Sequence, residues 1–328
     1  MSAIIEVTDL VKKYGDLTAV KGISFEVELG EIFGFLGPNG AGKTTTISIL
    51  CTLLSPTKGS AKLDGRDVAT ERDRVRESIG LVFQDPSLDD RLTAKENLEF
   101  HAYAYRVPKG ERDARIQEVL EMVELLDRQN DRVETFSGGM KRRLEIARGL
   151  LHYPKVLFLD EPTIGLDPQT RNSIWEYIRE LKKKHSITIF LTTHYMDEAE
   201  NCDRIAIIDY GEIIALDTPE GLKSQVGGDV IKISTADDEQ AEQVLIDDYD
   251  VDMIQDRECL CFEVADSENF VPRFIKAFPI AINSISMHRP TLDDVFLKLT
   301  GREIRDQEAG ALDSMRAFAR AWRPPGRR

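Results

Sequence analysis

GPNGAGKT, from Gly37 to Thr44, is the stretch of sequence that decides the fold. It fits the pattern G-x-x-x-x-G-K-[ST], and it stands between a short apolar segment and a helical one. Glycines let such a turn curl until several backbone N–H groups face one anion, and the next helix adds positive partial charge. The stretch predicts a phosphate-binding loop made of Gly37, Pro38, Asn39, Gly40, Ala41, Gly42, Lys43, Thr44 and Thr45.

Side chains that suit ATP and Mg²⁺ occur in this loop and in a second motif. Lys43 can reach the β- and γ-phosphates, and the Thr44 hydroxyl can ligate Mg²⁺. VLFLDE, at 156–161, predicts a buried strand whose two terminal acids lie at the carboxyl edge of a sheet, beside the loop. We expect Asp160 to hold Mg²⁺ and Glu161 to act as a general base or to orient water. Capping of the next turn is the weaker interpretation of these acids.

A second helix start suited to an anion occurs about 100 residues after the loop, at FSGGM, 136–140. Ser137 fits a helix N-cap, and Gly138 and Gly139 leave backbone N–H groups accessible. Both helix starts could serve one nucleotide in the same chain. Alternatively, each could complete a site on a second copy.

The order of segments predicts two domains and a tail. Strand–helix alternation over 1–220 predicts an α/β domain with a mostly parallel sheet covered by helices, interrupted by a helical insertion at about 90–152. Residues 221–300 predict a small α+β domain whose βαββαβ order fits a ferredoxin-like unit. The tail, 301–328, is basic, and it is either an amphipathic helix for a membrane surface or a solvated end.

Composition excludes several kinds of protein. Of 328 residues, 43 are Lys or Arg and 58 are Asp or Glu, so the net charge of -15 argues against nucleic acid as a partner. The 4 cysteines are scattered, which favours a reducing compartment over disulfides or a zinc site. An apolar run of about 18 residues is lacking, and so are the basic residues of a signal peptide. We therefore expect a cytoplasmic protein that reaches a membrane only through a partner.

The motifs together resemble the ATP-binding-cassette (ABC) family. The resemblance is carried by the motifs GPNGAGKT, FSGGM and VLFLDE. Gln84 in LVFQD, IGLD at 164–167 and His194 in LTTH match the family as well. The resemblance covers about 1–220 and implies a P-loop NTPase fold with a helical subdomain, and ATP and Mg²⁺ as cofactors. In this family the signature matched by Ser137, Gly138 and Gly139 contacts the γ-phosphate held by the opposite subunit. The resemblance therefore implies a homodimer with ATP at the interface.

Further roles follow from the same resemblance. Tyr14 matches the aromatic residue that stacks on adenine, although it could simply be a half-exposed tyrosine at a strand end. Gln84 matches the glutamine that approaches Mg²⁺ and the attacking water. Asp167 matches an acid that acts across the dimer, with helix capping as the alternative, and His194 matches the histidine that contacts the γ-phosphate. Met140 departs from the glutamine of the commonest signature, which affects only side-chain contributions there.

The subgroup is indicated by THYMDEAE at 193–200 and PTLDDVFLKLTG at 290–301, which are similar to exporters of the daunorubicin-resistance type. This resemblance implies an ATPase subunit for multidrug export, held at the cytoplasmic face of the membrane by a separate permease. Residues 85–105 are the expected docking segment, although their apolar side chains could equally belong to the helical core. The alternatives are a soluble ABC ATPase and an ATP-dependent regulatory module.

Overall fold

The computed structural model describes residues 3–84, 87–185, 187–249, 251–254 and 260–300. The described residues form two compact units, one ending at Leu216 and the other beginning at Asp217. The division falls at the end of β10 (Glu212–Asp217), slightly before the 220/221 boundary expected from composition. The basic tail, 301–328, lies outside the described residues. In the part of the chain that is described, no helix is long and apolar enough to cross a membrane.

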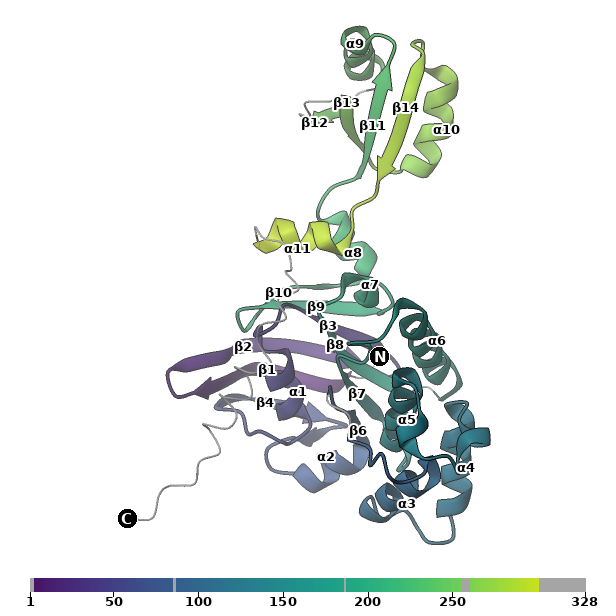
Figure 1. Cartoon of the computed structure of the whole chain (residues 1–328). Coiled ribbons are helices and arrows are strands. Elements are labelled where there is room, and N and C mark those ends of the chain that lie inside the picture. The colour runs from purple at the N-terminus through teal and green to yellow at the C-terminus, as the bar shows by residue number, and fades with distance from the viewer. Residues whose placement is uncertain (1–2, 85–86, 186, 250, 255–259, 301–328) are drawn as a thin grey trace. The chain divides into compact units, whose positions relative to one another are not determined.

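A six-stranded sheet forms the centre of the first unit, in the order β10-β9-β3-β8-β7-β6. Strands β3 and β7 each pair in parallel with two neighbours, and β3, β7 and β8 are buried along their whole length. This confirms the predicted α/β fold with a parallel sheet (Figure 1). The strands besides β10 are β3 (Ile32–Leu36), β6 (Ile79–Val82), β7 (Val156–Asp160), β8 (Thr188–Thr193) and β9 (Arg204–Asp209).

A second sheet in this unit differs from the expectation of one mostly parallel sheet. β1 (Ala3–Tyr14) pairs antiparallel with both β2 (Leu17–Glu28) and β4 (Lys58–Leu63), and β4 continues into β5 (Arg66–Asp67). Along β2 the residues Val20, Ile23, Phe25 and Val27 are buried while their neighbours are not, which is the pattern of a sheet with one face in the core.

Aromatic packing joins the two sheets. The Phe25 ring, from β2, stacks on that of Phe33, from β3, with centroids 5.6 Å apart. Phe190 contacts both rings and also Phe35 and Phe158. Helix α1 (Lys43–Leu50) contributes Ile47, Ile49 and Leu50 to the same core. This packing fixes the end of β3 from which the phosphate loop emerges.

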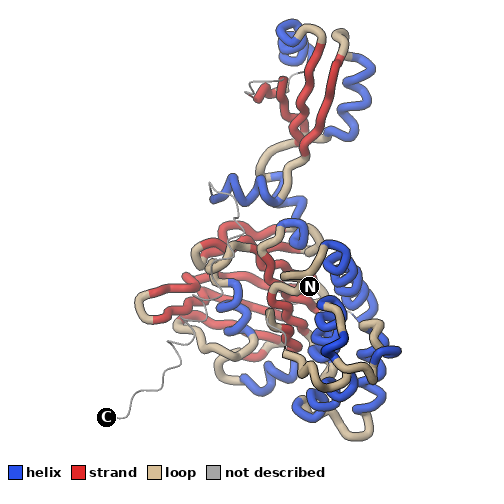
Figure 2. Tube along the Cα trace, viewed as in Figure 1, coloured by secondary structure: helices blue, strands red, loops and turns tan. Residues whose placement is uncertain are grey.

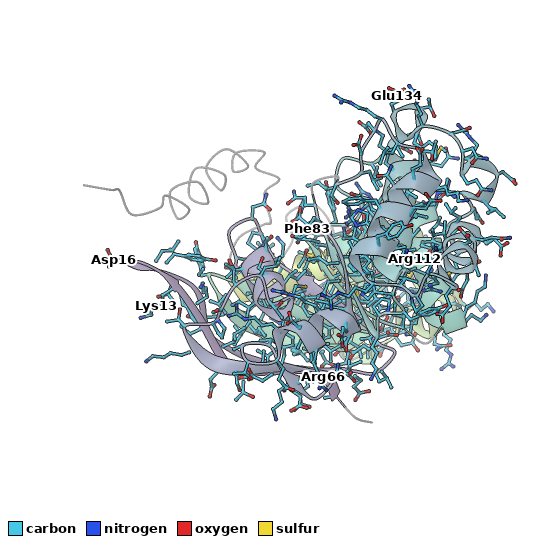
Figure 3. The ribbon with its side chains drawn as sticks, turned by 90° about the horizontal axis from the view of Figure 1, so that it is seen from below. Lys13, Asp16, Arg66, Phe83, Arg112 and Glu134 are labelled. Carbon is cyan, nitrogen blue, oxygen red and sulfur yellow. The ribbon has the colours of Figure 1, made fainter. Side chains whose placement is uncertain are left out.

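The helical subdomain follows β6 and contains α3 (Ala94–Ala104), α4 (Arg112–Met122) and α5 (Gly138–Leu150). Thr93 and Glu96 form a capping box that starts α3. Helix α4 ends at Met122, Glu124 has a positive φ of 55°, and the chain continues into 3₁₀ turns at Leu126–Arg128 and Val133–Thr135. Figure 3 shows this subdomain, marked by Arg112 and Glu134, at the opposite end of the unit from the β1–β2 hairpin, marked by Lys13 and Asp16. Helices α2 (Arg72–Ser78), α6 (Pro168–His185) and α7 (Met196–Ala199) complete the unit.

The second unit has the element order βαββαβ between two helices that pack together, α8 (Pro219–Ser224) and α11 (Leu292–Thr300). Its antiparallel sheet has the order β12-β13-β11-β14, and Val230 of β11 pairs with His288 of β14 (Figure 2). The core includes Ile231, Phe262 and Phe274. The elements of this motif are β11 (Asp229–Thr235), α9 (Asp238–Tyr249), β12 (Asp252–Ile254), β13 (Leu260–Val264), α10 (Ser267–Ala277) and β14 (Ile282–His288).

Candidate active site

The phosphate-binding loop connects β3 to α1, and its shape depends on glycine. A Cβ atom on Gly37 would lie 2.2 Å from the backbone oxygen of Ile208. Gly42 has a φ of 109°, in the left-handed region, and a Cβ there would lie 2.7 Å from the Ala19 oxygen. These two positions therefore accept no larger residue without displacing the backbone of β2 or β9.

The start of α1 offers hydrogen-bond donors to an anion. Among the hydrogen bonds of the described residues, none uses the backbone N–H groups of Lys43, Thr44 or Thr45 as donor. The first N–H groups of a helix have no intrahelical acceptor, and they suit phosphate oxygens. This donor set, together with the Lys43 ammonium, fits the phosphates of a nucleotide.

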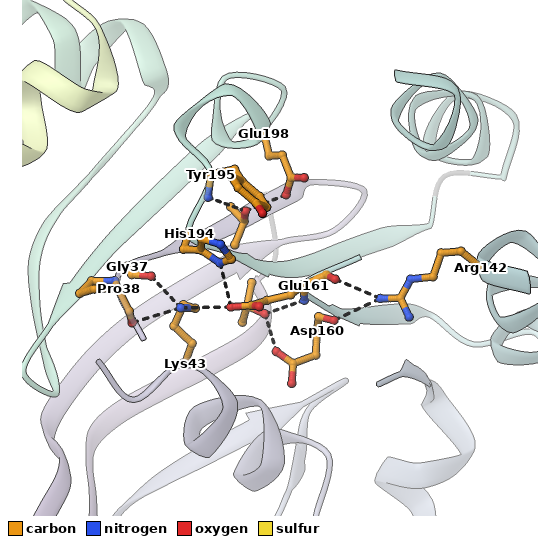
Figure 4. Close-up of polar contacts among 11 residues, drawn as sticks. Gly37, Pro38, Lys43, Arg142, Asp160, Glu161, His194, Tyr195 and Glu198 are labelled. Carbon is orange, nitrogen blue, oxygen red and sulfur yellow. Dashed lines mark hydrogen bonds and ion pairs between the residues drawn. The ribbon is translucent and has the colours of Figure 1, made fainter. Parts of the chain in front are cut away.

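Lys43 lies buried at the centre of the site, with 5% of its surface exposed. Its Nζ donates to the backbone oxygens of Gly37, at 2.6 Å, and Pro38, at 3.2 Å, and lies 3.4 Å from Oε1 of Glu161 (Figure 4). Burial lowers the pKa of Lys43, while the Glu161 carboxylate opposes that shift. The sequence prediction that Lys43 and Glu161 lie in one site is consistent with this contact.

Asp160 ends β7, beside the loop. Its Oδ1 accepts a hydrogen bond from the Thr192 hydroxyl at 2.5 Å. Burial raises the pKa of Asp160, and hydrogen bonds from Thr192 and from Thr44 act in the opposite direction. The side chains of Asp160 and Thr44, both expected at Mg²⁺, are therefore adjacent, and a carboxylate with a hydroxyl is a donor set that fits this ion.

Glu161 stands where the chain leaves β7, and its φ of 46° is unusual for a residue with a side chain. Its N–H lies within hydrogen-bond distance of the Thr192 backbone oxygen, at 3.2 Å, and hydroxyl, at 3.1 Å. His194 Nδ1 lies 3.2 Å from Glu161 Oε1. Burial raises the pKa of Glu161, but His194 and Lys43 outweigh burial and bring the pKa below its ordinary value. The carboxylate is thus ionised at neutral pH and able to accept a proton.

Comparison with known proteins shows the family to which the chain belongs. The profile of the ABC transporter family matches residues 20–164. Linearmycin resistance ATP-binding protein LnrL of Bacillus subtilis is 41% identical over 312 residues, which cover 92% of this chain and 100% of LnrL. The chain belongs to the ABC transporter family. Daunorubicin/doxorubicin resistance protein DrrA of Streptomyces peucetius is 38% identical, over 92% of this chain and 94% of its own, which confirms the predicted subgroup.

Solved ABC structures share the fold. One, cbiO1 from Clostridium perfringens, described as part of the transporter complex cbiONQ, has a TM-score of 0.64 and 30% identity, covering 76% of this chain and 97% of cbiO1. Another is a dimer of the ATP-binding cassette MJ0796 in a post-hydrolysis state with ADP and Pi. Its TM-score is 0.58 at 30% identity, covering 65% of this chain and 98% of that one.

The ABC signature residues lie apart from the phosphate loop of their own chain. Ser137 and Gly138 are exposed at the start of α5, where the Ser137 hydroxyl accepts from the Met140 N–H at 3.3 Å, as expected of an N-cap. Phe136 is buried. Gly139 packs so closely that a Cβ would lie 2.4 Å from a methyl of Thr170. No hydrogen bond or ion pair among the described residues joins this helix start to the phosphate loop.

Three other predicted residues form no hydrogen bond or ion pair with Lys43, Asp160 or Glu161 in the described part of the chain. Tyr14, 38% exposed, ends β1 with the Lys12 Nζ 5.1 Å from its ring centroid. Asp167 caps α6, accepting from the Thr170 N–H at 3.0 Å and hydroxyl at 2.6 Å, so the capping interpretation describes its present contacts. Gln84 is exposed and lies beyond the end of β6 at Val82.

Two buried residues of the site were missed by sequence reasoning. Thr192 is fully buried and holds both Asp160 and Glu161, and Arg142 binds the backbone that carries them. A threonine in an apolar strand has no distinctive pattern. Arg142 offered a faint signal, because a charged residue on the core-facing side of a helix requires a partner.

Proposed function

We propose that this chain is the ATP-hydrolysing subunit of an ABC exporter, and that it works as a homodimer with ATP and Mg²⁺ at the interface. The observation that carries the proposal is the cluster of Lys43, Glu161 and His194 beside the phosphate loop, with contacts of 3.2 to 3.4 Å. Relatives named for linearmycin, daunorubicin and Nod factor export support the exporter class. ATP binding and hydrolysis by this chain would drive conformational change in a separate membrane permease, which the chain contacts from the cytoplasmic face.

In the proposed reaction, water attacks the γ-phosphorus, the bond to the ADP oxygen breaks, and Glu161 accepts the proton of the water. Lys43 and the N–H groups of the loop hold the β- and γ-phosphates, while His194 keeps Glu161 oriented and would contact the γ-phosphate. Thr44, Asp160 and Gln84 would hold Mg²⁺, which would neutralise charge on the phosphates. Tyr14 would stack on adenine.

The proposal of a dimer rests on the separation between Ser137–Gly139 and the loop of the same chain. Because Ser137 and Gly138 are exposed at a helix start, they can bind a phosphate that a second copy holds, with Asp167 acting across the same interface. ATP binding would then close the pair, and hydrolysis would reopen it, since a ligand shifts an equilibrium through its differential affinity for two states.

The permease surface is proposed for residues 85–105, of which 85 and 86 lie outside the described residues. Phe100 and Tyr103 of α3 are 66% and 63% exposed, and Tyr105 is 37% exposed. The guanidinium of Arg112 covers the Tyr103 ring at 3.9 Å. Leu98 and Ala102 of the same helix are buried, so the helix has one core face and one aromatic face available to a partner.

The decisive experiment replaces Glu161 by Gln in the full chain. We expect ATP-dependent dimers to accumulate in gel filtration, while turnover falls by about 100-fold or more, because the general base is lost. Glu180→Gln is the matched control, since Glu180 is an exposed acid that pairs with Lys184 on α6. Wild-type turnover in Glu161→Gln would remove Glu161 from the mechanism.

The exporter role has its own test. The chain is purified from its native membranes in mild detergent, and the proteins that accompany it are identified. A membrane permease would support export, whereas a ribosome or a DNA-repair complex would favour a soluble ABC ATPase. Turnover by the wild-type chain also separates an ATPase from a slow regulatory module.

A further inference from the structure

Arg142 connects the signature helix with the strand that carries the catalytic acids. It lies on α5, the helix that Ser137 caps, and only 7% of its surface is exposed. Its Nε donates to the Pro162 oxygen at 2.7 Å, and its Nη2 donates to the backbone oxygens of Asp160, at 3.1 Å, and Glu161, at 3.4 Å. One side chain therefore holds three consecutive carbonyl groups at the end of β7. Figure 4 shows two of these contacts, to Asp160 and Glu161.

These carbonyl groups belong to backbone that is difficult to hold in place. The φ of Glu161, 46°, lies in the left-handed region, which side chains disfavour and which persists only where the surroundings impose it. Thr192 binds the N–H of Glu161 on one side. Arg142 binds its C=O and the neighbouring carbonyls on the other, so the direction of the Glu161 carboxylate depends on both residues.

The same guanidinium also reaches the segment that leads to Gln84. Its Nη1 donates to the Phe83 oxygen at 2.6 Å and lies 3.0 Å from Oε2 of Glu145, which is also buried on α5. Glu145 accepts in turn from the Ser87 N–H at 2.9 Å. A planar guanidinium with five donors can span such a set of acceptors, and a lysine ammonium cannot.

We infer that Arg142 is a positioning residue for hydrolysis, which sets the Glu161 carboxylate through contacts made by the signature helix of the same subunit. The inference rests on the proposed function. Among the described residues, Arg142 forms no hydrogen bond or ion pair with the phosphate loop, where Lys43 is held by Gly37, Pro38 and Glu161. Its loss should therefore slow the chemical step and leave ATP binding unchanged.

Three variants of the full chain test this. Arg142→Gln alone would leave the Glu145 carboxylate buried without its partner, so it is combined with Glu145→Gln, which removes both charges. Arg142→Lys keeps the charge beside Glu145 but cannot span the carbonyl groups. Arg143→Gln is the control, because Arg143 follows on the same helix and binds only Val123 and Glu124 among the described residues.

For the double variant and Arg142→Lys we expect kcat for ATP to fall about 10- to 100-fold with KM within about twofold, since a small misplacement of a catalytic group has effects of this size. Arg143→Gln should keep the wild-type kcat, even if its thermal midpoint falls as much as that of the Arg142 variants. The inference is overturned if either folded Arg142 variant keeps the wild-type kcat, or if its kcat/KM falls only because KM rises. In both cases the proposed function still stands. A wild-type chain without turnover overturns both.

Discussion

The side-chain hydroxyl of Thr192 lies 2.5 Å from Oδ1 of Asp160 and donates a hydrogen bond to it. Removing that hydroxyl in Thr192→Val takes one hydrogen bond from the buried Asp160 carboxylate, which we expect to destabilise the fold by about 1–3 kcal/mol. We also expect ATPase activity to require more Mg²⁺ for half-saturation, because Asp160 loses its fixed orientation. Urea denaturation and a Mg²⁺ titration of turnover measure the two effects.

Thr188→Val is the matched control for this prediction. Thr188 is also fully buried on β8, and its hydroxyl accepts from the Gly30 N–H at 2.9 Å, at the opposite end of the strand. This variant should lose stability without changing the Mg²⁺ requirement. An unchanged requirement in Thr192→Val would show that Asp160 needs no support from Thr192.

Gly37→Ala should damage both the fold and nucleotide binding. The new methyl would approach the Ile208 backbone oxygen to 2.2 Å, and backbone cannot rotate away as a side chain can. Insertion of atoms into such packing costs about 1–3 kcal/mol or more, so we expect a lower urea midpoint and loss of ATP binding. Gly110→Ala, which has nothing within 4 Å, should leave both unchanged.

Tyr14→Ala tests the adenine contact. Stacking of a base on an aromatic ring contributes about 1–3 kcal/mol, so we expect weaker ATP binding in equilibrium titration, by about 10-fold or more. Tyr14→Phe keeps the ring and should bind like the wild-type chain. Equal affinity in Tyr14→Ala would identify Tyr14 as a half-exposed tyrosine at a strand end.

His101 should make stability depend on pH. Burial, together with the charge of Arg148, lowers the pKa of His101 from 6.5 to about 4. In the unfolded chain the imidazole gains a proton as pH falls below 6.5, while in the folded chain it stays neutral until about 4. Proton uptake by the unfolded state therefore reduces stability across that window, and the stability is fully present above it.

The variant His101→Gln removes this titration. Above pH 6.5 the thermal midpoints of the wild-type chain and the variant should differ by a constant amount. As pH falls from 6.5 towards 4, the two midpoints should converge or cross. Because carboxylates titrate in the same range, only the difference between the two curves is informative. A constant difference over the whole range would show that the folded protein binds the proton as readily as the unfolded chain.

Lys43, Asp160 and Glu161 could be placed from the sequence because each belongs to a local pattern: a glycine turn before a helix, or acids that end an apolar strand. Arg142 and Thr192 could not, because their partners at the end of β7 are distant in sequence and the strand neighbours were unknown. The order of strands decides that Thr192 stands beside Asp160, since β8 pairs with β7. Apolar runs predict that a strand is buried, but they do not predict its neighbours.

The antiparallel sheet illustrates the same limit. The alternation along β2 predicts a strand with one buried face. It does not predict that β1 pairs with β4, because the paired residues, such as Ile5 and Leu63, are far apart in the sequence. An Asp-Gly pair is a local turn signal, and Asp64 and Gly65 both have positive φ in the turn between β4 and β5. The left-handed backbone of Glu161 carried no such signal, because glutamate rarely adopts it.

Pairing of Val230 with His288 means that the chain enters and leaves the βαββαβ motif through adjacent strands. The motif is therefore a closed insertion between α8 and α11, with both of its ends side by side. Evolution could enlarge, replace or delete such an insertion without moving the helix pair that flanks it, as could a protein engineer. A chain with a short turn from 229 to 289 would join the two helices directly and provide a natural starting point for grafting a reporter domain.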